Sequence, residues 1–112
     1  LMVKGPQPGD ASYELFEKEE SEIFEGLKRR SERLVEALNA TDGITCNPAE
    51  GAMYAFPSVE IPTQAIEAAK KQGMAPDTLY TLSLLEETGI CVVPASGFGQ
   101  KEGRFGFRTT FL

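Results

Sequence analysis

Apolar side chains recur every eleven residues through the first third of the chain, and this spacing is the strongest constraint on the fold. Eleven residues make about three turns of an α-helix, so such a stripe runs almost straight, whereas a heptad seam would supercoil. We therefore expect one long helix over about residues 11–39, packed against a globular body. The repeating positions are Phe16, Leu27 and Leu38, then Tyr13, Phe24 and Val35, then Ile23 and Leu34.

Turn-forming residues divide the middle of the chain into short elements. Residues 44–46 and 52–56 lie on either side of the turn sequence 47–51, a pattern that predicts a β-hairpin. Pro62 suits the first turn of a short helix, which would end near Gly73. This part of the chain therefore predicts a hairpin followed by a helix.

A second short helix is expected to begin at Pro76. Gly89 should end it, because glycine suits the left-handed backbone found after many helices. The leucines of this helix should face the core, namely Leu79, Leu82 and Leu85.

The last part of the chain predicts two strands joined by a loop. Residues 91–93 predict a buried strand, residues 94–103 a flexible loop and residues 104–111 a final strand. The loop glycines weakly resemble a nucleotide-binding loop, but that motif leads into a helix and this one leads into a strand. Alternate residues of the final strand share a face: Phe105, Phe107, Thr109 and Phe111 on one, Arg104, Gly106, Arg108 and Thr110 on the other.

The order of these elements predicts an α+β fold, a two-layer sandwich of one long helix and two shorter helices on a small mixed sheet. A chain of 112 residues is long enough for one such domain. It begins inside an apolar run and stops directly after a strand-like segment. We therefore expect it to be a fragment of a larger protein.

The composition argues against several kinds of function. The net charge is −6, so neither nucleic acid nor a membrane is expected as a partner. No segment has the roughly 18 to 20 apolar residues of a membrane span, and no signal peptide is recognisable. Histidine is absent, so a Ser-His-Asp or Cys-His nucleophile system cannot be assembled from this chain.

The cysteines and lysines offer little chemistry. Cys46 and Cys91 lie in apolar, strand-like segments, and we expect two buried, reduced thiols and no metal site. A Schiff-base lysine needs burial to lower its pKa. No lysine meets this need, because all fall on predicted helix surfaces, in the loop or in the extended segment 4–9: Lys4, Lys18, Lys28, Lys70, Lys71 and Lys101.

Arg108 is the side chain with the clearest potential for binding. It lies on the final strand, which would hold it rigidly, and Gly106 on the same face should leave open space beside its guanidinium. Arginine grips a carboxylate through two parallel hydrogen bonds. Two interpretations stay open on spacing alone: a carboxylate-binding arginine, or an exposed arginine on the surface of a sheet.

Several segments resemble the C-terminal part of alanine aminotransferases, and together they cover nearly the whole chain. The segment from residue 84 to residue 100 is typical of that family in particular. The matching motifs are PGDASY (8–13), CNPAEGAMY (46–54), FP (56–57), LLEETGICVVP (84–94), SGFGQ (96–100) and FRTT (107–110).

The resemblance implies a pyridoxal-phosphate-dependent enzyme of fold type I. Residues 1–9 would be a truncated interdomain linker and residues 10–112 the C-terminal small domain. The Schiff-base lysine and the other cofactor-binding residues would lie upstream in a missing large domain. No catalytic, cofactor-binding or metal-binding residue is therefore expected in this chain, which would be inactive alone.

The resemblance also implies a reaction and its setting. The intact enzyme would transfer an amino group between L-alanine and 2-oxoglutarate, giving pyruvate and L-glutamate. Arg108 would clamp the substrate α-carboxylate, and Tyr54 would lie close to the substrate. A homodimer in the cytoplasm or the mitochondrion is expected.

The sequence departs from the family pattern at three places. Gly106 stands where the family usually has histidine, Ala95 where it usually has glycine, and Lys4-Gly5 where Asn-Pro is more usual. A related transaminase with a different amino-acid preference therefore stays open as an alternative. So does a non-catalytic α+β module that presents its sheet to a protein partner.

Overall fold

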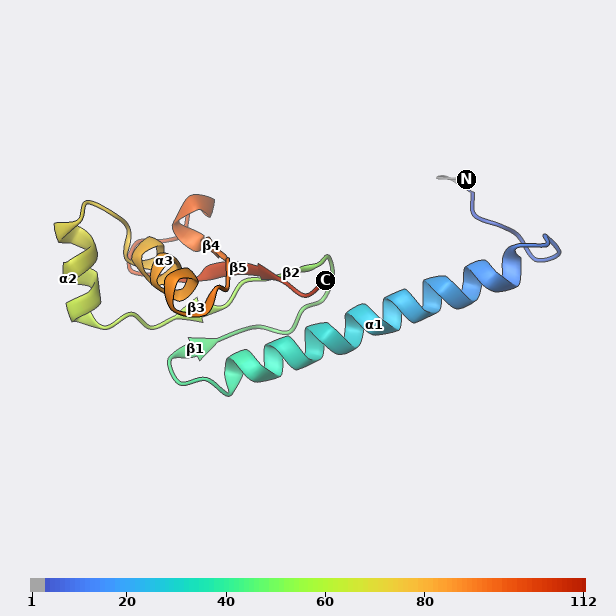
Figure 1. The fold of residues 1–112 in the computed structure, drawn as a ribbon, viewed down its shortest axis with the longest axis horizontal. Coiled ribbons are helices and arrows are strands. Elements are labelled where there is room, and N and C mark those ends of the chain that lie inside the picture. The colour runs from blue at the N-terminus through green and yellow to red at the C-terminus, as the bar shows by residue number, and fades with distance from the viewer. Residues whose placement is uncertain (1–3) are drawn as a thin grey trace.

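The computed structural model describes residues 4–112 and confirms the α+β class. Three α-helices, one short 3₁₀ helix and five short strands follow one another in these residues (Figure 1). Their order and bounds are α1 (Tyr13–Asn39), β1 (Ile44–Thr45), β2 (Tyr54–Ala55), β3 (Ser58–Val59), α2 (Thr63–Lys71), α3 (Pro76–Thr88), β4 (Val93–Pro94), η1 (Ala95–Phe98) and β5 (Phe107–Thr110).

The strands form antiparallel ladders. Strand β5 lies between β2 and β4, and β1 pairs with β3. A single bridge between Ser58 and Gly106 connects the two groups of strands. The ladders in the described residues are all antiparallel, whereas we expected a mixed sheet.

The predicted hairpin between residues 44–46 and 52–56 is wrong. Ile44 of β1 pairs with Val59, and Ala55 of β2 pairs with Thr109 of β5. Residues 54–59 form one extended stretch, and the end of this stretch lies beside β1 while its start lies beside β5. Pairing with β5 buries Ala55, which pattern reading along the chain could not reveal because β5 is distant in sequence.

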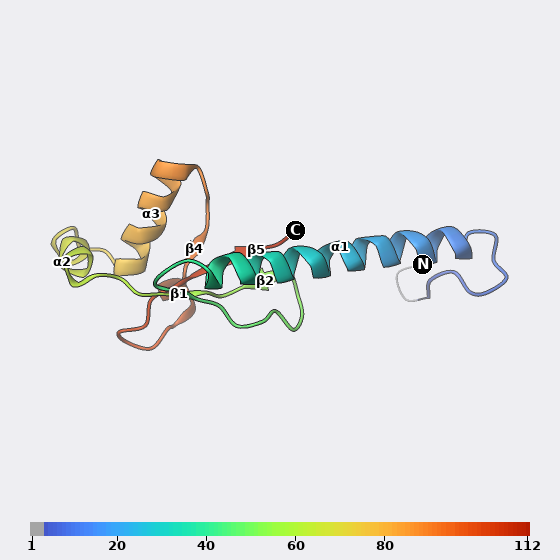
Figure 2. The same cartoon turned by 90° about the horizontal axis from the view of Figure 1, so that it is seen from below.

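The long helix is confirmed, but it does not pack along its whole length. Its N-terminal half extends beyond the strands in Figures 1 and 2, and Ile23 and Phe24 are 64% and 65% exposed. A helix of 27 residues is roughly 40 Å long, whereas the strands beside it have only two to four residues. The body is therefore too short to cover the apolar stripe.

The C-terminal half of α1 is held to the body by hydrogen bonds. Arg30 Nε donates to the carbonyl oxygen of Phe111 at 3.1 Å. Asn39 Nδ2 donates to the carbonyl oxygen of Cys46, and Cys46 N donates to Asn39 Oδ1, both at 2.9 Å. These bonds join the helix to the end of the chain and to the segment after β1.

Both short helices are present. Pro62 immediately precedes α2 rather than lying in its first turn, and Gly89 ends α3 with a φ of 76°, as expected. The predicted inward orientation of the leucines is wrong for Leu82 and Leu85, which are exposed, whereas Leu79 is half-buried. The inward face of α3 instead carries Asp77, Tyr80 and Thr81, and the Tyr80 ring stacks on Phe107 with centroids 6.1 Å apart.

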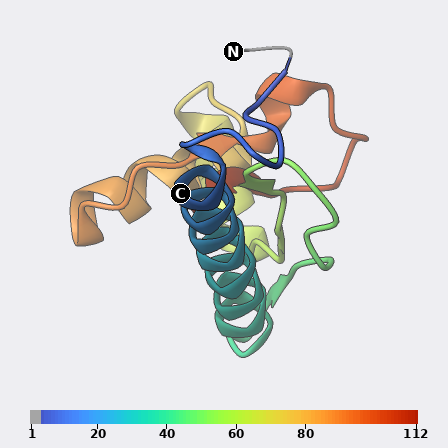
Figure 3. The same ribbon diagram turned by 90° about the vertical axis from the view of Figure 1, so that its right-hand side faces the viewer.

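Helix α3 stands crosswise to α1, and only its first turns rest on the strands (Figures 2 and 3). A helix in this position leaves the side chains of its last turns in solvent. This geometry explains why the leucines near its C-terminus are exposed although they are apolar.

The segment around Cys91 is not a buried strand. Strand β4 is an edge strand of two residues, Val93 and Pro94, and Cys91 is exposed. Cys46 is buried and free, as expected, and burial raises the pKa of its thiol. The expectation of two buried thiols therefore holds for Cys46 and fails for Cys91.

The final strand shows the predicted alternation, although β5 is shorter than residues 104–111. Phe107 and Phe111 are buried on one face, while Arg108 lies half-buried on the other. The buried apolar side chains of the body are Cys46, Ala55, Val59, Ala69, Ala95, Phe107 and Phe111.

Candidate functional site

Arg108 lies on the central strand of the three-stranded sheet. It pairs with Val93 of β4, while Tyr54 of β2 pairs with Thr110, two residues further along β5. Residues two apart on a strand share a face, so Arg108 and Tyr54 are diagonal neighbours on the same face. The opposite face of β5 packs into the core through Phe107.

Two aromatic rings enclose the guanidinium of Arg108. Its Cζ atom lies 4.7 Å from the centroid of the Tyr54 ring and 4.7 Å from that of the Phe98 ring. Phe56 contacts Phe98 edge to face, with centroids 5.7 Å apart. We refer to Tyr54, Phe56, Phe98 and Arg108 as the arginine cluster.

The arginine cluster leaves the hydrogen-bond donors of Arg108 available. Aromatic rings accept a guanidinium through their π faces and leave its N–H groups available, because these groups point outward in the guanidinium plane. Within residues 4–112, the ion pair found joins Lys18 and Glu22 in the N-terminal half of α1. Arg108 forms no salt bridge in these residues. A half-buried cation with free donors suits a bidentate bond to a carboxylate from outside the chain.

Gly106 does not leave open space beside Arg108, contrary to our expectation. A Cβ atom at this position would collide with the carbonyl oxygen of Pro57. The backbone of residues 57–58 passes close to Gly106, and Phe107 N donates to Pro57 O at 3.2 Å. In this structure, glycine therefore permits the close approach of the two backbone segments.

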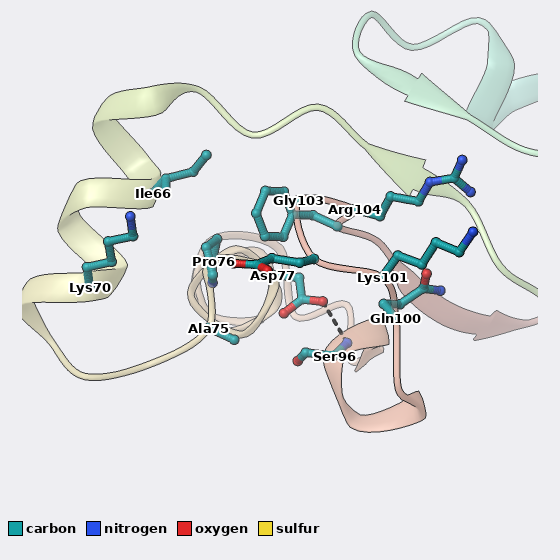
Figure 4. Close-up of a pocket in the computed structure, with 12 residues that line it drawn as sticks. Ile66, Lys70, Ala75, Pro76, Asp77, Ser96, Gln100, Lys101, Gly103 and Arg104 are labelled. Carbon is teal, nitrogen blue, oxygen red and sulfur yellow. Dashed lines mark hydrogen bonds between the residues drawn. The ribbon is translucent and has the colours of Figure 1, made fainter.

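A buried carboxylate is bonded to η1, the element that carries Phe98, and was not identified from the sequence. Asp77, in the first turn of α3, is 1% exposed, and its Oδ2 accepts a 2.7 Å hydrogen bond from Ser96 N (Figure 4). Its Oδ1 is buried without a hydrogen-bond partner among the described residues. An aspartate directly after a helix-opening proline could have indicated a cap, but not a bond to residue 96.

Asp77 and Ser96 also line a shallow hollow of about 510 Å³ between α2, α3 and the loop before β5 (Figure 4). Lys70, Lys101 and Arg104 surround this hollow, whereas the arginine cluster does not line it. All three cations are exposed. The hollow and the arginine cluster are thus separate features.

The described residues contain no buried lysine and no cluster of metal-binding side chains beside the arginine cluster. Every lysine is exposed, so none has the burial that a Schiff-base lysine needs. No group of three metal-binding side chains occurs in residues 4–112. None of the helices described is long and apolar enough to cross a membrane.

Comparison with known proteins finds relatives along the whole chain. The sequence model of a family described as aminotransferase class I and II matches residues 11–111. A probable mitochondrial alanine aminotransferase of Dictyostelium discoideum is 56% identical over 112 residues, which are 100% of this chain and 21% of that protein. Glutamate–glyoxylate aminotransferase 2 of Arabidopsis thaliana is 52% identical over 112 residues, 100% of this chain and 23% of that protein.

A solved structure has the same fold. An alanine aminotransferase from Pyrococcus furiosus superposes with a TM-score of 0.64 at 29% identity, over 81% of this chain and 20% of that one. The chain thus spans about a fifth of the length of the relatives that it matches.

Proposed function

Because this chain belongs to the family of class I and II aminotransferases, we propose that it is the C-terminal small domain of a pyridoxal-phosphate-dependent aminotransferase. Residues 10–112 form this domain, and residues 1–9 are the end of the linker to a large domain. The exposed apolar face of α1 supports a larger protein, because side chains such as Ile23 and Phe24 need a cover.

The role of Arg108 in this proposal is to bind the α-carboxylate of the substrate. The observation that carries the proposal is the half-buried guanidinium, which lies 4.7 Å from the centroids of both the Tyr54 and Phe98 rings and has its donors free. Amino acids and 2-oxo acids both bear an α-carboxylate, so one arginine serves both halves of an amino transfer. A bidentate bond also fixes the direction of the substrate Cα relative to the rest of the active site.

In this proposal the site for pyridoxal phosphate lies in the large domain. Aminotransferases of this family use that cofactor, but every lysine here is solvent-exposed. The large domain would therefore bind the cofactor and perform the covalent chemistry. The contribution of this chain is to bind and orient the substrate.

L-alanine and 2-oxoglutarate, giving pyruvate and L-glutamate, are the proposed substrates and products. The Dictyostelium discoideum relative, an alanine aminotransferase by name, supports this pair. The Arabidopsis thaliana relative, named for glutamate and glyoxylate, favours a second candidate: a related aminotransferase with a different preference. Both candidates need the same carboxylate-binding arginine.

The setting of the intact enzyme is also part of the proposal. We infer a homodimer and a location in the cytoplasm or the mitochondrion. The name of the Dictyostelium discoideum relative supports the mitochondrion.

Steady-state kinetics of the intact aminotransferase that contains this chain test the proposal. Arg108→Gln should raise KM for L-alanine and for 2-oxoglutarate by about a hundredfold, because a charge-assisted pair is lost. Arg104→Gln, an exposed arginine outside the arginine cluster, serves as the matched control and should leave both KM values unchanged. Unchanged KM values in Arg108→Gln contradict the role of this residue.

Product analysis separates the candidate functions. Formation of pyruvate from L-alanine supports an alanine aminotransferase, and a higher kcat/KM with glyoxylate than with 2-oxoglutarate supports the second candidate. Absence of amino transfer between these acids and the other common amino acids and their 2-oxo acids supports the non-catalytic module.

A further inference from the structure

The burial of Asp77 is unusual for a side chain with so few partners. A carboxylate in the protein interior is costly unless hydrogen bonds replace its lost water. Asp77 is 1% exposed, yet the hydrogen bond found for its side chain is the one from Ser96 N at 2.7 Å. Because Oδ1 has no partner within the described residues, stability alone is a poor reason for this aspartate.

The bond from Ser96 N to Asp77 helps to hold a short element, η1, whose first residue, Ala95, is buried in the core. Helix η1 has four residues. The backbone nitrogen of its first residue, Ala95, donates a hydrogen bond to Gly106 O at 2.9 Å. Gly97 lies within η1 and Gly99 follows it, and a Cβ atom at either position would meet nothing within 4 Å. The position of η1 is thus set at its first two residues, by the burial of Ala95 and by the hydrogen bonds of Ala95 N and Ser96 N, because its glycines make no close packing.

The side chain that η1 presents is Phe98, one of the two rings on Arg108. Ser96 precedes Phe98 by two residues, so a shift of the Ser96 backbone moves the ring as well. The ring is exposed on its outer side and contacts Phe56 edge to face. Asp77, Ser96, Phe98 and Arg108 therefore form a continuous series of contacts from the core to the substrate-binding guanidinium.

We propose that Asp77 is a positioning residue for substrate binding: through Ser96 N it holds η1 so that the Phe98 ring stays over the guanidinium of Arg108. With both rings in contact, the guanidinium keeps one orientation before the substrate arrives, and less conformational freedom is lost on binding. This inference rests on the proposed role of Arg108 and adds a residue that touches neither the substrate nor the arginine.

Variants of the intact aminotransferase test the inference. Asp77→Ala removes the acceptor, and Asp77→Asn keeps an acceptor of the same shape without the charge. Asp77→Ala should raise KM for L-alanine and 2-oxoglutarate about fivefold, with less than about a twofold change in kcat. The KM values of Asp77→Asn should lie between those of Asp77→Ala and those of the unchanged protein. Asp77→Asn also keeps the test decisive if Asp77→Ala fails to fold.

The matched control is Thr81→Val. Thr81 is also buried, lies one turn further along α3, and its Oγ1 donates to the carbonyl oxygen of Thr78 rather than to η1. Loss of stability in α3 should lower the melting temperature of this variant without raising KM. A KM increase in Thr81→Val equal to that in Asp77→Ala would overturn the inference, because the effect would then be general to α3.

A double variant tests whether Asp77 acts through Phe98. Phe98→Leu removes the ring, and adding Asp77→Asn to it should raise KM no further, because the tether has no ring left to hold. If the KM increases of Phe98→Leu and Asp77→Asn multiply in the double variant, the two residues act independently and the inference is overturned. An unchanged KM in both Asp77→Asn and Asp77→Ala also overturns it. If Arg108→Gln leaves KM unchanged, the proposed function fails. If Arg108→Gln raises KM but the Asp77 variants leave it unchanged, only the positioning role of Asp77 fails.

Discussion

The guanidinium carbon of Arg108 lies 4.7 Å from the centre of the Tyr54 ring, although the two residues belong to different strands and are far apart in sequence. Their contact follows from the register of β2 and β5, in which Tyr54 pairs with Thr110. The pairing places the ring diagonally across from Arg108 on the same face of the sheet. Sheet register thus determines the orientation of the proposed substrate-binding group.

Replacing Tyr54 should weaken substrate binding through loss of the ring. A cation–π contact at a partly exposed site contributes about 0.5–1 kcal/mol. Tyr54→Leu should therefore raise KM for L-alanine and 2-oxoglutarate about two- to fivefold in the intact aminotransferase, whereas Tyr54→Phe should leave KM unchanged. Steady-state kinetics with both acids provide the measurement. If Tyr54→Phe were as impaired as Tyr54→Leu, the hydroxyl group would be the important feature.

Local patterns correctly predicted several elements of this fold, although the hairpin and the buried strand at residues 91–93 were wrong. The eleven-residue repeat predicted α1, and the glycine at position 89 ends α3 in the left-handed conformation. Alternation along the final strand correctly separated Phe107 from Arg108. These features depend on residues that are close together in the sequence, so they can be predicted from the sequence alone.

The pairing of strands that are distant in the sequence could not be predicted from local sequence patterns. The partner of β1 is β3 and that of β2 is β5, and neither choice follows from the turn sequence between residues 47 and 51. Phe98 and Asp77 were missed for the same reason, since their importance comes from contacts with Arg108 and Ser96 across the fold. Cys91 is exposed because β4 is a short edge strand, which its apolar neighbours do not indicate.

Gly106→Ala should destabilise the fold, because the new Cβ atom would collide with the backbone carbonyl of Pro57. Backbone cannot rotate away as a side chain can, so we expect a loss of about 1–3 kcal/mol in the free energy of unfolding. Urea unfolding of the intact protein measures it. Gly51→Ala is the control, since a Cβ atom there meets nothing within 4 Å, and its effect should stay within about 0.5 kcal/mol. Equal stability of the two variants would contradict the close approach at Gly106.

The two thiols of this 112-residue chain should differ in reactivity. Cys91 is exposed and should react with a chromogenic disulfide reagent in the native state, whereas Cys46 is buried and should react only on unfolding. Cys91→Ser and Cys46→Ser each leave one thiol, so the two rates can be measured separately. Rapid native reaction of the Cys91→Ser variant would contradict the burial of Cys46.

Burial of Cys46 should also make stability depend on pH in alkaline solution. Its pKa in the native state is raised above the ordinary value of 9.0 by desolvation, so the native state disfavours the thiolate. The stability associated with the neutral thiol should be complete below pH 9 and be lost as the pH rises through the raised pKa. Urea unfolding of the chain should show this loss, and Cys46→Ser should remove that part of the pH dependence. A Cys46→Ser profile identical to that of the unchanged chain would contradict the expected link.

Asn39 should contribute strongly to the attachment of α1, because its side chain makes two hydrogen bonds to the backbone of Cys46, one as donor and one as acceptor, both at 2.9 Å. Asn39→Ala removes both bonds and should lower the free energy of unfolding by about 1–2 kcal/mol. Asn39→Asp keeps the acceptor for Cys46 N but faces the Cys46 carbonyl with a negative charge, so it should recover only part of the loss. Asn47→Ala serves as the control in the same urea titrations, since Asn47 is exposed and only its backbone carbonyl accepts a bond, from the Cys46 thiol. If Asn39→Ala and Asn47→Ala unfold at the same urea concentration, the paired bonds do not hold the helix to the body, and the contact between Arg30 and Phe111 must carry the attachment instead.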